Sequence, residues 1–232
     1  MQLSKRLSAV AELVTPGSRL ADVGCDHGYI PIALVKAGII PSAIAMDVNE
    51  GPLMRARQNI ESFAAAQYIE TRLSDGVSAL EPGEADSLIM AGMGGILMMR
   101  IMDEGWKVLE SVKEIILQPQ SEAASVRRYL QSRNYRITAE DMVYEDGKYY
   151  IMMKAVHGSM EEMSPIFCRF GRLLLQQRHP VLFQYLKERQ EKYSRIQEKI
   201  CRQGREGSRN RQEEIEKEMQ EIASALRYYE MQ

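Results

Sequence analysis

Carboxylates and glycines alternate through one short stretch of the chain, residues 22–28, which reads DVGCDHG. The glycines let the backbone turn sharply and let a ligand approach it closely. A dinucleotide-binding turn would place glycine at positions 24, 26 and 29, whereas this chain has Gly24, Asp26 and Tyr29 there. Because a carboxylate repels a pyrophosphate and attracts a cation, these residues predict a positively charged ligand at the turn.

The spacing Asp22-x-Gly24-x-Asp26-x-Gly28 is similar to the first motif of class I methyltransferases, many of which have glycine in place of Asp26. Their cofactor, S-adenosylmethionine, carries a sulfonium and an ammonium group and no phosphate, so its charge suits this turn. The alternative interpretation is a purely structural turn in another α/β protein, because short glycine motifs also occur without a ligand.

Two further acidic residues follow predicted strands. Asp47 ends the second strand, about twenty residues beyond the turn, where this fold places the acid that binds ribose hydroxyls. Asp75 precedes Gly76 after the third strand, from where a carboxylate often meets the adenine amino group in adenosylmethionine enzymes. The alternatives are a helix cap for Asp47 and an ordinary Asp-Gly turn for Asp75.

A second glycine-rich loop, AGMGG at residues 91–95, follows the fourth predicted strand, and Gln118-Pro119-Gln120 follows the fifth. Ligands of open α/β sheets bind outside the carboxyl ends of the strands, so both segments are expected to face the first turn. The loop contains no acid or base, and the Asn/Asp-Pro-Pro-aromatic motif of many amino-group methyltransferases is absent from it. The alternative interpretation of the loop is a flexible strand-to-helix turn.

Strand-like and helix-like segments alternate through the first two thirds of the chain. The expected strands are residues 20–23, 42–46, 67–73, 85–90, 113–117, 135–143 and 149–156. An Asp146-Gly147 pair between the last two is a strong hairpin signal. An amphipathic helix with Leu3, Leu7 and Val10 on one face precedes the sheet. The order predicts an α/β, Rossmann-like class I methyltransferase fold with a seven-stranded, mostly parallel sheet.

Length and composition fit one full domain and a smaller appendage, at residues 1–158 and 159–232 of the 232. No apolar run approaches the ~20 residues that span a bilayer, and the first residues do not read as a signal peptide. The three cysteines lack CxxC spacing and the three histidines are scattered, which predicts free thiols, no metal site and a cytoplasmic location. The oligomeric state stays open, with a monomer as the expectation.

The C-terminal part is basic. Residues 165–211 hold twelve Lys or Arg against four Glu, a net charge of +8 in a chain whose total is -2. A helix over 167–175 and two apolar stripes at heptad spacing, within 182–200 and 215–229, predict a coiled-coil helical hairpin around a loop at 204–210. Its outward cations suggest an anionic partner, and the alternative is a solvated charged face. The cations expected to face outward are Arg169, Arg172, Arg178, Lys187, Lys192, Arg195 and Lys199.

Five segments together resemble the bacterial tRNA (adenine(22)-N1)-methyltransferase family, TrmK. They read ADVGCDHGYIP, AGMGG, LQPQ, EDGKYY and FGRLLLQQRHP, and the resemblance covers nearly the whole chain. It implies a Rossmann-like catalytic domain, a C-terminal coiled coil, S-adenosylmethionine as cofactor and tRNA as partner.

The resemblance also implies roles for individual residues. The implied cofactor contacts are Asp22, Gly24, Cys25, Asp26, Gly28, Asp47, Val48, Asp75, Gly76, Ala91 and Gly92. Asp26, His27 and Tyr29 become candidates for catalysis at the target base, although His27 could equally be a structural histidine. The implied substrate contacts are Met93, Gly94 and Gly95. Gln118 and Pro119, from their place at the end of the fifth strand, and the seven outward cations of the tail, from their charge, are further candidate substrate contacts.

The reaction expected from this resemblance needs little acid–base catalysis. Adenine N1 carries a free lone pair that can attack the sulfonium methyl group, so positioning and desolvation should dominate. Asp26 is the favoured carboxylate for the adenine amino group, because Asp47 is expected to bind ribose. Two alternatives remain, a methyltransferase for another RNA, a small molecule or a protein, and a non-enzymatic dinucleotide-binding regulator.

Overall fold

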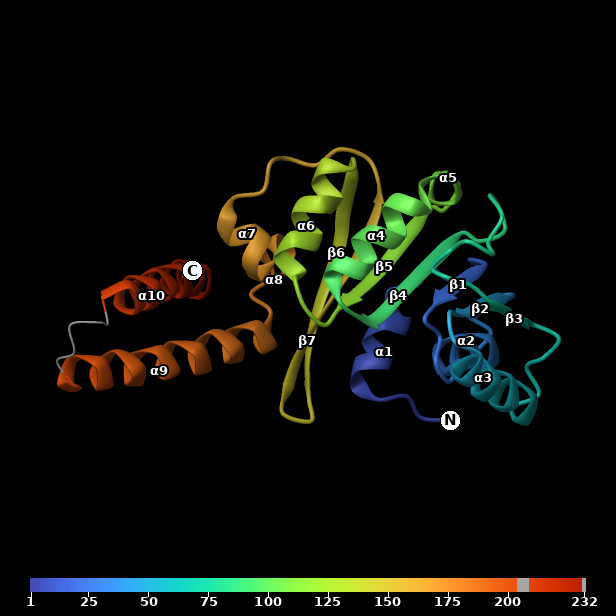
Figure 1. The fold of residues 1–232 in the computed structure, drawn as a ribbon, viewed down its shortest axis with the longest axis horizontal. Helices are drawn as coiled ribbons and strands as arrows, with labels where there is room; N and C mark the ends of the chain where they lie inside the picture. Colours follow the sequence, from blue (N-terminus) through green and yellow to red (C-terminus); the bar gives the residue numbers. More distant parts are fainter. Residues whose placement is uncertain (204–208, 231–232) are drawn as a thin grey trace. The chain divides into compact units, whose positions relative to one another are not determined.

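The structure is a computed structural model that describes the backbone of residues 1–203 and 209–230 (Figure 1). Side chains are described for residues 1–200 and 212–230. Contacts within the chain divide it into two compact units, Met1–Glu162 and Met163–Gln232. The division falls shortly after the boundary that the sequence predicts, and each unit is described by itself.

A seven-stranded sheet forms the centre of the first unit, in the order β3-β2-β1-β4-β5-β7-β6. The strands are β1 (Leu20–Val23), β2 (Ala43–Asp47), β3 (Ile69–Leu73), β4 (Ser87–Met93), β5 (Glu114–Pro119), β6 (Tyr135–Glu145) and β7 (Lys148–His157). β1 to β5 are parallel, and β7 runs antiparallel between β5 and β6. The predicted Rossmann-like, mostly parallel sheet is therefore confirmed. Its strand order reverses between β1 and β4, where this fold places its ligands.

Helices cover both faces of this sheet. They are α1 (Lys5–Glu12), α2 (Tyr29–Lys36), α3 (Glu50–Ser62), α4 (Gly95–Glu104), α5 (Trp106–Leu109) and α6 (Ala123–Ser132). Successive strand residues enter opposite cores, as the two-residue period of a strand requires: Ile89 belongs to the core under α1, α2 and α3, whereas Leu88 and Met90 belong to the core under α4, α5 and α6. Buried on both sides, the central strands are almost continuously apolar.

The segment before β1 is tied to strands from the other end of the unit. The Glu145 carboxylate, at the end of β6, accepts hydrogen bonds from the backbone N–H of Lys5 (2.6 Å) and of Arg6 (3.2 Å). Lys154 Nζ on β7 donates to the carbonyl of Leu13 at 3.0 Å. These contacts fasten α1 to the β6–β7 hairpin, whose turn has positive φ at Asp146 (50°) and Gly147 (77°), as an Asp-Gly hairpin turn requires.

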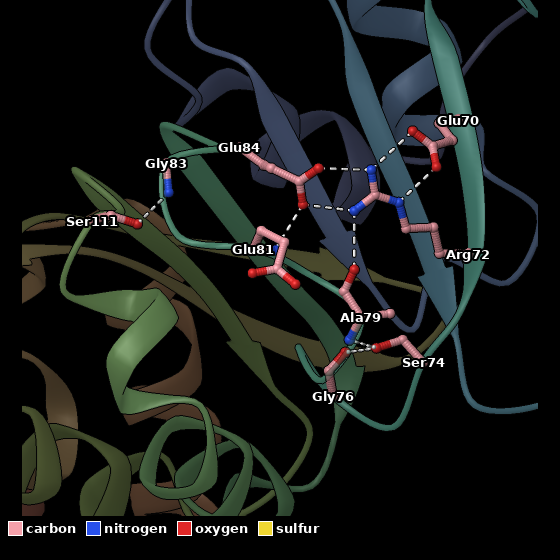
Figure 2. Close-up of polar contacts among 9 residues, drawn as sticks. All are labelled: Glu70, Arg72, Ser74, Gly76, Ala79, Glu81, Gly83, Glu84 and Ser111. Carbon is pink, nitrogen blue, oxygen red and sulfur yellow. Dashed lines mark hydrogen bonds and ion pairs between the residues drawn. The ribbon is translucent and has the colours of Figure 1, made fainter.

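An arginine closes the loop between β3 and β4. Arg72 binds Glu70 (Nε–Oε1, 2.7 Å), Glu84 (Nη1–Oε2, 2.6 Å) and the carbonyl of Ala79 (2.9 Å), as Figure 2 shows. Hydrogen bonds from Arg72 lower the pKa of Glu84 to about 2. Within the same loop, Ser74 Oγ donates to the Gly76 carbonyl at 3.0 Å. The clamp fixes the turn that follows β3.

The second unit consists of helices. They are α7 (Pro165–Phe170), α8 (Arg172–Gln176), α9 (Pro180–Gln203) and α10 (Arg209–Glu230). The single helix predicted over 167–175 is wrong, because Gly171, at φ 90°, interrupts it. Helices α9 and α10 pack against each other. The seam of α9 is fully buried at Leu182 and Leu186 but only half-buried towards Ile200, so coiled-coil geometry stays a prediction. The loop predicted at 204–210 falls largely outside the described residues.

Candidate active site

A cavity of about 420 Å³ lies beside the carboxyl ends of β1 and β4. It is lined by Arg6, Leu7, Asp22, Gly24, Cys25, Asp26, His27, Tyr29, Ile30, Ala91, Gly92 and Gln120. Eight of these are residues to which the sequence analysis assigns a role at the site: Asp22, Gly24, Cys25, Asp26, His27, Tyr29, Ala91 and Gly92. The fold thus brings the first turn and the start of the second glycine loop to one site.

The backbone of the first turn is committed to the sheet. The N–H groups of Gly24 (2.8 Å) and Cys25 (2.9 Å) both donate to the carbonyl of Met46 at the end of β2. Gly24 has φ 75°, and a Cβ there would lie 3.1 Å from Cε of Met93. With two turn amides already bonded, this turn does not form the amide cradle that a pyrophosphate needs.

Two carboxylates are buried at the carboxyl ends of β1 and β2. Asp22 is 4% exposed and Asp47 is 9% exposed. Burial, with the charge of Asp47 as a second cause, raises the pKa of Asp22 to about 7. Asp47 Oδ1 also accepts the N–H of Asn49 at 2.9 Å; because Asn49 is itself the N-cap of α3, this bond fixes the turn before the helix and does not make Asp47 its cap. A cationic ligand would offset the cost of burying this negative charge.

The neighbouring thiol of Cys25 is not built as a nucleophile. Burial first, and then the charges of Asp22 and Asp47, raise the pKa of the Cys25 thiol far above its usual range. The thiolate is the nucleophilic form of cysteine, so Cys25 stays neutral and inert at neutral pH.

An aromatic pair stands next to an exposed carboxylate at this cavity. The His27 and Tyr29 rings are stacked, with centroids 5.1 Å apart and planes 8° apart. Asp26, in the left-handed region at φ 45°, places Oδ1 2.9 Å from Arg55 Nη2 and Oδ2 3.5 Å from His27 Nε2. The His27 side chain is 38% exposed, which argues against a purely structural histidine. A flat exposed pair of rings can stack on a nucleobase.

Arg6 lines the cavity although the sequence analysis does not select it, whereas Gln120 belongs to the segment that is expected to face the first turn. Arg6 Nη1 donates to Gln118 Oε1 at 2.9 Å across 112 positions of sequence. Gln118 and Pro119, the predicted substrate contacts, are buried, and it is Gln120 beside them that lines the cavity. No sequence pattern pairs α1 with the end of β5, so only the tertiary structure could identify Arg6.

The second glycine loop divides into two parts. Gly92, at φ 78°, lies at a register shift between β4 and β5 and opens the cavity wall. Gly94 precedes α4 as its N-cap, and Met93 packs beside Gly24. At Gly95 a Cβ would lie 2.7 Å from a backbone oxygen of the α6 entry, so close packing alone accounts for glycine at that position.

Other predicted cofactor residues lie outside this cavity. Asp75 and Gly76 line a second cavity of about 240 Å³ with residues of α4 and α5, and Asp75 Oδ1 lies 3.6 Å from Arg100 Nη2. Val48 is 56% exposed immediately after β2, and Gly28, at φ 68°, packs against Ala56 of α3. Asp47 and Val48 lie at the same edge of the sheet as the first turn, but they do not line the cavity.

The predicted outward cations of the tail do not all face outward. Arg169 forms ion pairs with Glu218 (2.6 Å) and Glu221 of α10, which corrects the expectation that its charge is free. Arg172 is half-buried, and its guanidinium lies over the Phe167 ring. Exposed positions are held by Arg178, Lys187, Lys192, Arg195 and Lys199. Five more cations belong to the basic stretch. Arg189 is half-buried between two tyrosines. The side chains of residues 202, 205, 209 and 211 lie outside the described part.

Two features are absent from the described residues. None of their helices has the length and apolar character needed to cross a membrane. No three or more His, Cys, Asp or Glu side chains among them gather closely enough to hold a metal ion.

Comparison with known proteins places these observations in context. Residues 3–153 match the family model of a methyltransferase domain. The tRNA (adenine(22)-N(1))-methyltransferase of Bacillus subtilis is 35% identical over 161 residues, which are 69% of this chain and 68% of that protein. The Bacillus subtilis M1A22 tRNA methyltransferase TrmK has a crystal structure that superposes with a TM-score of 0.83 at 29% identity, over 97% of this chain and 99% of that one.

Two ligand-bound structures are also similar. A Streptococcus pneumoniae protein, a candidate tRNA (m1A22) methyltransferase in complex with S-adenosyl-L-methionine, has a TM-score of 0.86 at 35% identity, over 97% of this chain and 100% of that one. The TrmK of M. capricolum, in complex with S-adenosyl-homocysteine, has a TM-score of 0.83 at 25% identity, over 98% of this chain and 99% of that one.

Proposed function

Because this chain belongs to the bacterial tRNA (adenine(22)-N1)-methyltransferase family, we propose that it methylates N1 of adenine 22 in tRNA at the cavity beside β1 and β4. The observation that carries the proposal is the chemistry of the first turn. Its Gly24 and Cys25 amides are bonded to Met46, and buried Asp22 stands beside them. Such a turn disfavours a phosphate and favours a cationic cofactor.

The residues at this sheet edge suit S-adenosylmethionine. Asp22 would face the ammonium group of the cofactor, and Asp47 would accept hydrogen bonds from its ribose hydroxyls. Gly24 and Gly92 leave the backbone bare, so a ligand can lie close against both strand ends. Val48, Asp75 and Gly76 lie along the expected path of the nucleoside, and Asp75 is the candidate for its adenine amino group.

When bound, S-adenosylmethionine supplies a methyl group on a positively charged sulfur. The lone pair of adenine N1 attacks this methyl carbon, and the sulfur leaves as a neutral thioether. The protein's share of the work is to orient the target and to exclude water. No general base is required for this attack. This agrees with the Cys25 thiol, whose raised pKa keeps it protonated and unreactive.

The target adenine must reach the cavity with its Watson–Crick edge free. N1 lies on that edge, so a paired nucleotide has to be flipped out at a cost of about a few kcal/mol. The stacked His27 and Tyr29 rings offer a face for the extruded base, and Asp26 beside them can accept a hydrogen bond from its amino group. Met93 and Gly94 are the candidate contacts on the opposite loop.

The exposed cations of the second unit are the candidate docking surface for the tRNA body. Phosphate contacts dominate nucleic-acid affinity, and five exposed Lys or Arg side chains lie on or next to α9. They are Arg178, Lys187, Lys192, Arg195 and Lys199. A substrate of this kind places the enzyme in the cytoplasm.

Nucleoside analysis of tRNA tests the proposed function. Purified protein, S-adenosylmethionine and unmodified tRNA should yield 1-methyladenosine by mass spectrometry. The same tRNA with guanine at position 22 should yield none. Methylation that persists on the substituted tRNA, or that appears on another base, would contradict the site of modification.

A further inference from the structure

Arg6 is a cavity residue held in place from three sides. The Glu145 carboxylate accepts its backbone N–H at 3.2 Å, Gln118 Oε1 accepts from its Nη1 at 2.9 Å, and its guanidinium carbon lies 5.5 Å from the centre of the Tyr150 ring. Of the five N–H donors of the guanidinium, the hydrogen bond to Gln118 uses one, at Nη1. Arg6 is therefore fixed in direction and still has donors to offer.

Carboxylates surround Arg6 at this cavity. Asp22 and Asp26 line it, and Asp47 is buried next to them at the same sheet edge. Within the described part of the chain, Arg6 is the only lysine or arginine among its lining residues. An anionic group that enters the cavity is repelled by the carboxylates unless it reaches this guanidinium.

The methionyl end of S-adenosylmethionine is such a ligand, because it carries both an ammonium and a carboxylate. We propose that Arg6 binds the α-carboxylate of the cofactor, while Asp22 faces the ammonium. A Cβ at Gly92 would lie in van der Waals contact with Arg6 Nη1, at 3.5 Å, so glycine leaves this side of the guanidinium uncovered. The inference rests on the proposed use of this cofactor, and it gives α1 a role in cofactor selection.

The arrangement separates the two charges of one ligand onto two elements. Asp22 belongs to β1, whereas Arg6 belongs to α1 and is oriented by Gln118 of β5 and Tyr150 of β7. A charge-assisted hydrogen bond of this kind is shorter and stronger than a neutral one. Ligands without the carboxylate cannot form this bond, although they can form all the others.

Calorimetric binding of two ligands tests the proposal. S-adenosylmethionine and decarboxylated S-adenosylmethionine share the sulfonium, the ammonium and the nucleoside, and only the first has the carboxylate. The wild-type protein should bind S-adenosylmethionine at least about tenfold more tightly. In Arg6→Gln that preference should shrink to about twofold or less, and Arg6→Lys should restore part of it. Arg128→Gln, which removes an exposed arginine of α6 outside the cavity, should leave it unchanged.

Equal loss of affinity for both ligands in Arg6→Gln would overturn the proposal, as would an unchanged preference. Equal affinity of the wild-type protein for the two ligands would also overturn it. This wild-type comparison tests the proposal even if the Arg6→Gln protein does not fold. A wild-type protein that binds neither ligand would instead contradict the proposed function.

Discussion

Burial in the fold raises the pKa of Asp22 so far that its carboxyl group gains or loses a proton near neutral pH. Its pKa rises from 3.8 to about 7, with burial as the larger cause and Asp47 as the smaller. Between these two pH values the native protein holds a proton that the unfolded chain has released. Asp22 therefore stabilises the fold at low pH, and this contribution is lost as the pH rises through about 7.

The variant Asp22→Asn isolates this effect. Between pH 5 and 7 the wild-type free energy of unfolding carries a falling contribution of up to about 1.4 kcal/mol per pH unit, which the variant lacks. The variant should thus gain stability relative to wild type across this range, and the difference should level off near pH 8. Urea unfolding at pH 5, 6, 7 and 8 measures it. A difference independent of pH would contradict the assignment.

Asp26 is exposed at the cavity, so its substitution should act on the reaction more than on the fold. In Asp26→Asn we expect the cofactor dissociation constant to change less than about threefold and the single-turnover rate on saturating tRNA to fall about tenfold or more, a loss of about 1.4 kcal/mol. Rapid-quench assays measure the rate. Arg55→Ala, which removes the ion-pair partner and keeps the carboxylate, is the control. A normal rate in Asp26→Asn would rule out a role at the target base.

At the scale of elements, local patterns predicted what is local. The β1 turn and the Asp146-Gly147 hairpin depend on residues adjacent in sequence, and both were predictable for that reason. The prediction that β4 ends at Met90 was too short, because the positive φ of Gly92 lets the strand continue across a register shift to Met93. Gly171 interrupts a run whose apolar spacing favours one helix.

Residues brought together by tertiary structure could not be predicted. Arg6 meets Gln118 only because α1 crosses towards the far half of the sheet, and nothing in its sequence neighbourhood marks it. Arg169 looks like a free cation in sequence, yet its partners lie some fifty positions later in α10. The roles of the site residues remain predictions until they are tested by substitution.

Gly95 tests whether the glycine loop serves the substrate or the packing. In Gly95→Ala the new Cβ would lie 2.7 Å from the Ser121 carbonyl oxygen and 2.8 Å from Val126 Cγ2, which should cost about 1–3 kcal/mol of stability. Gly94→Ala is the matched control, because its Cβ would stay 3.5 Å from Ser121 Oγ at φ −67°. Thermal unfolding of both measures the effect. Unchanged stability with lost tRNA methylation in Gly95→Ala would favour a substrate contact instead.

At the scale of the whole molecule, the two units should divide cofactor binding from tRNA docking. The sheet is complete at His157, and all the proposed cofactor residues lie in the first unit. Removing residues 163–232 should leave a folded protein that binds S-adenosylmethionine with wild-type affinity and binds tRNA weakly. Calorimetry with the cofactor and filter binding with tRNA measure the two properties. An aggregated or molten product would show that the second unit is chiefly a packing element.

Charge reversal tests the docking surface in the full chain. Replacing the five exposed cations by glutamate should weaken tRNA binding and make it less dependent on salt. The slope of log affinity against log salt concentration should become shallower by about 0.7 to 0.9 for each phosphate that the protein no longer neutralises. The five are Arg178, Lys187, Lys192, Arg195 and Lys199. Binding isotherms at several salt concentrations, on protein with unaltered circular dichroism, give the slope. An unchanged affinity would refute docking on this surface and leave the methyltransferase assignment intact.

The attachment of α1 to the β6–β7 hairpin determines when, during synthesis of the chain, α1 can take its final position. α1 leaves the ribosome before any strand, yet the carboxylate that receives its first N–H groups belongs to a residue 140 positions later. β7 fills an interior place in the sheet, so β5 remains an open edge until the last strand has emerged. A nascent chain that stalls before β6 has neither an anchored α1 nor Arg6 in its cavity. The cavity that contains Arg6 is therefore complete only after both β6 and β7 have been synthesised.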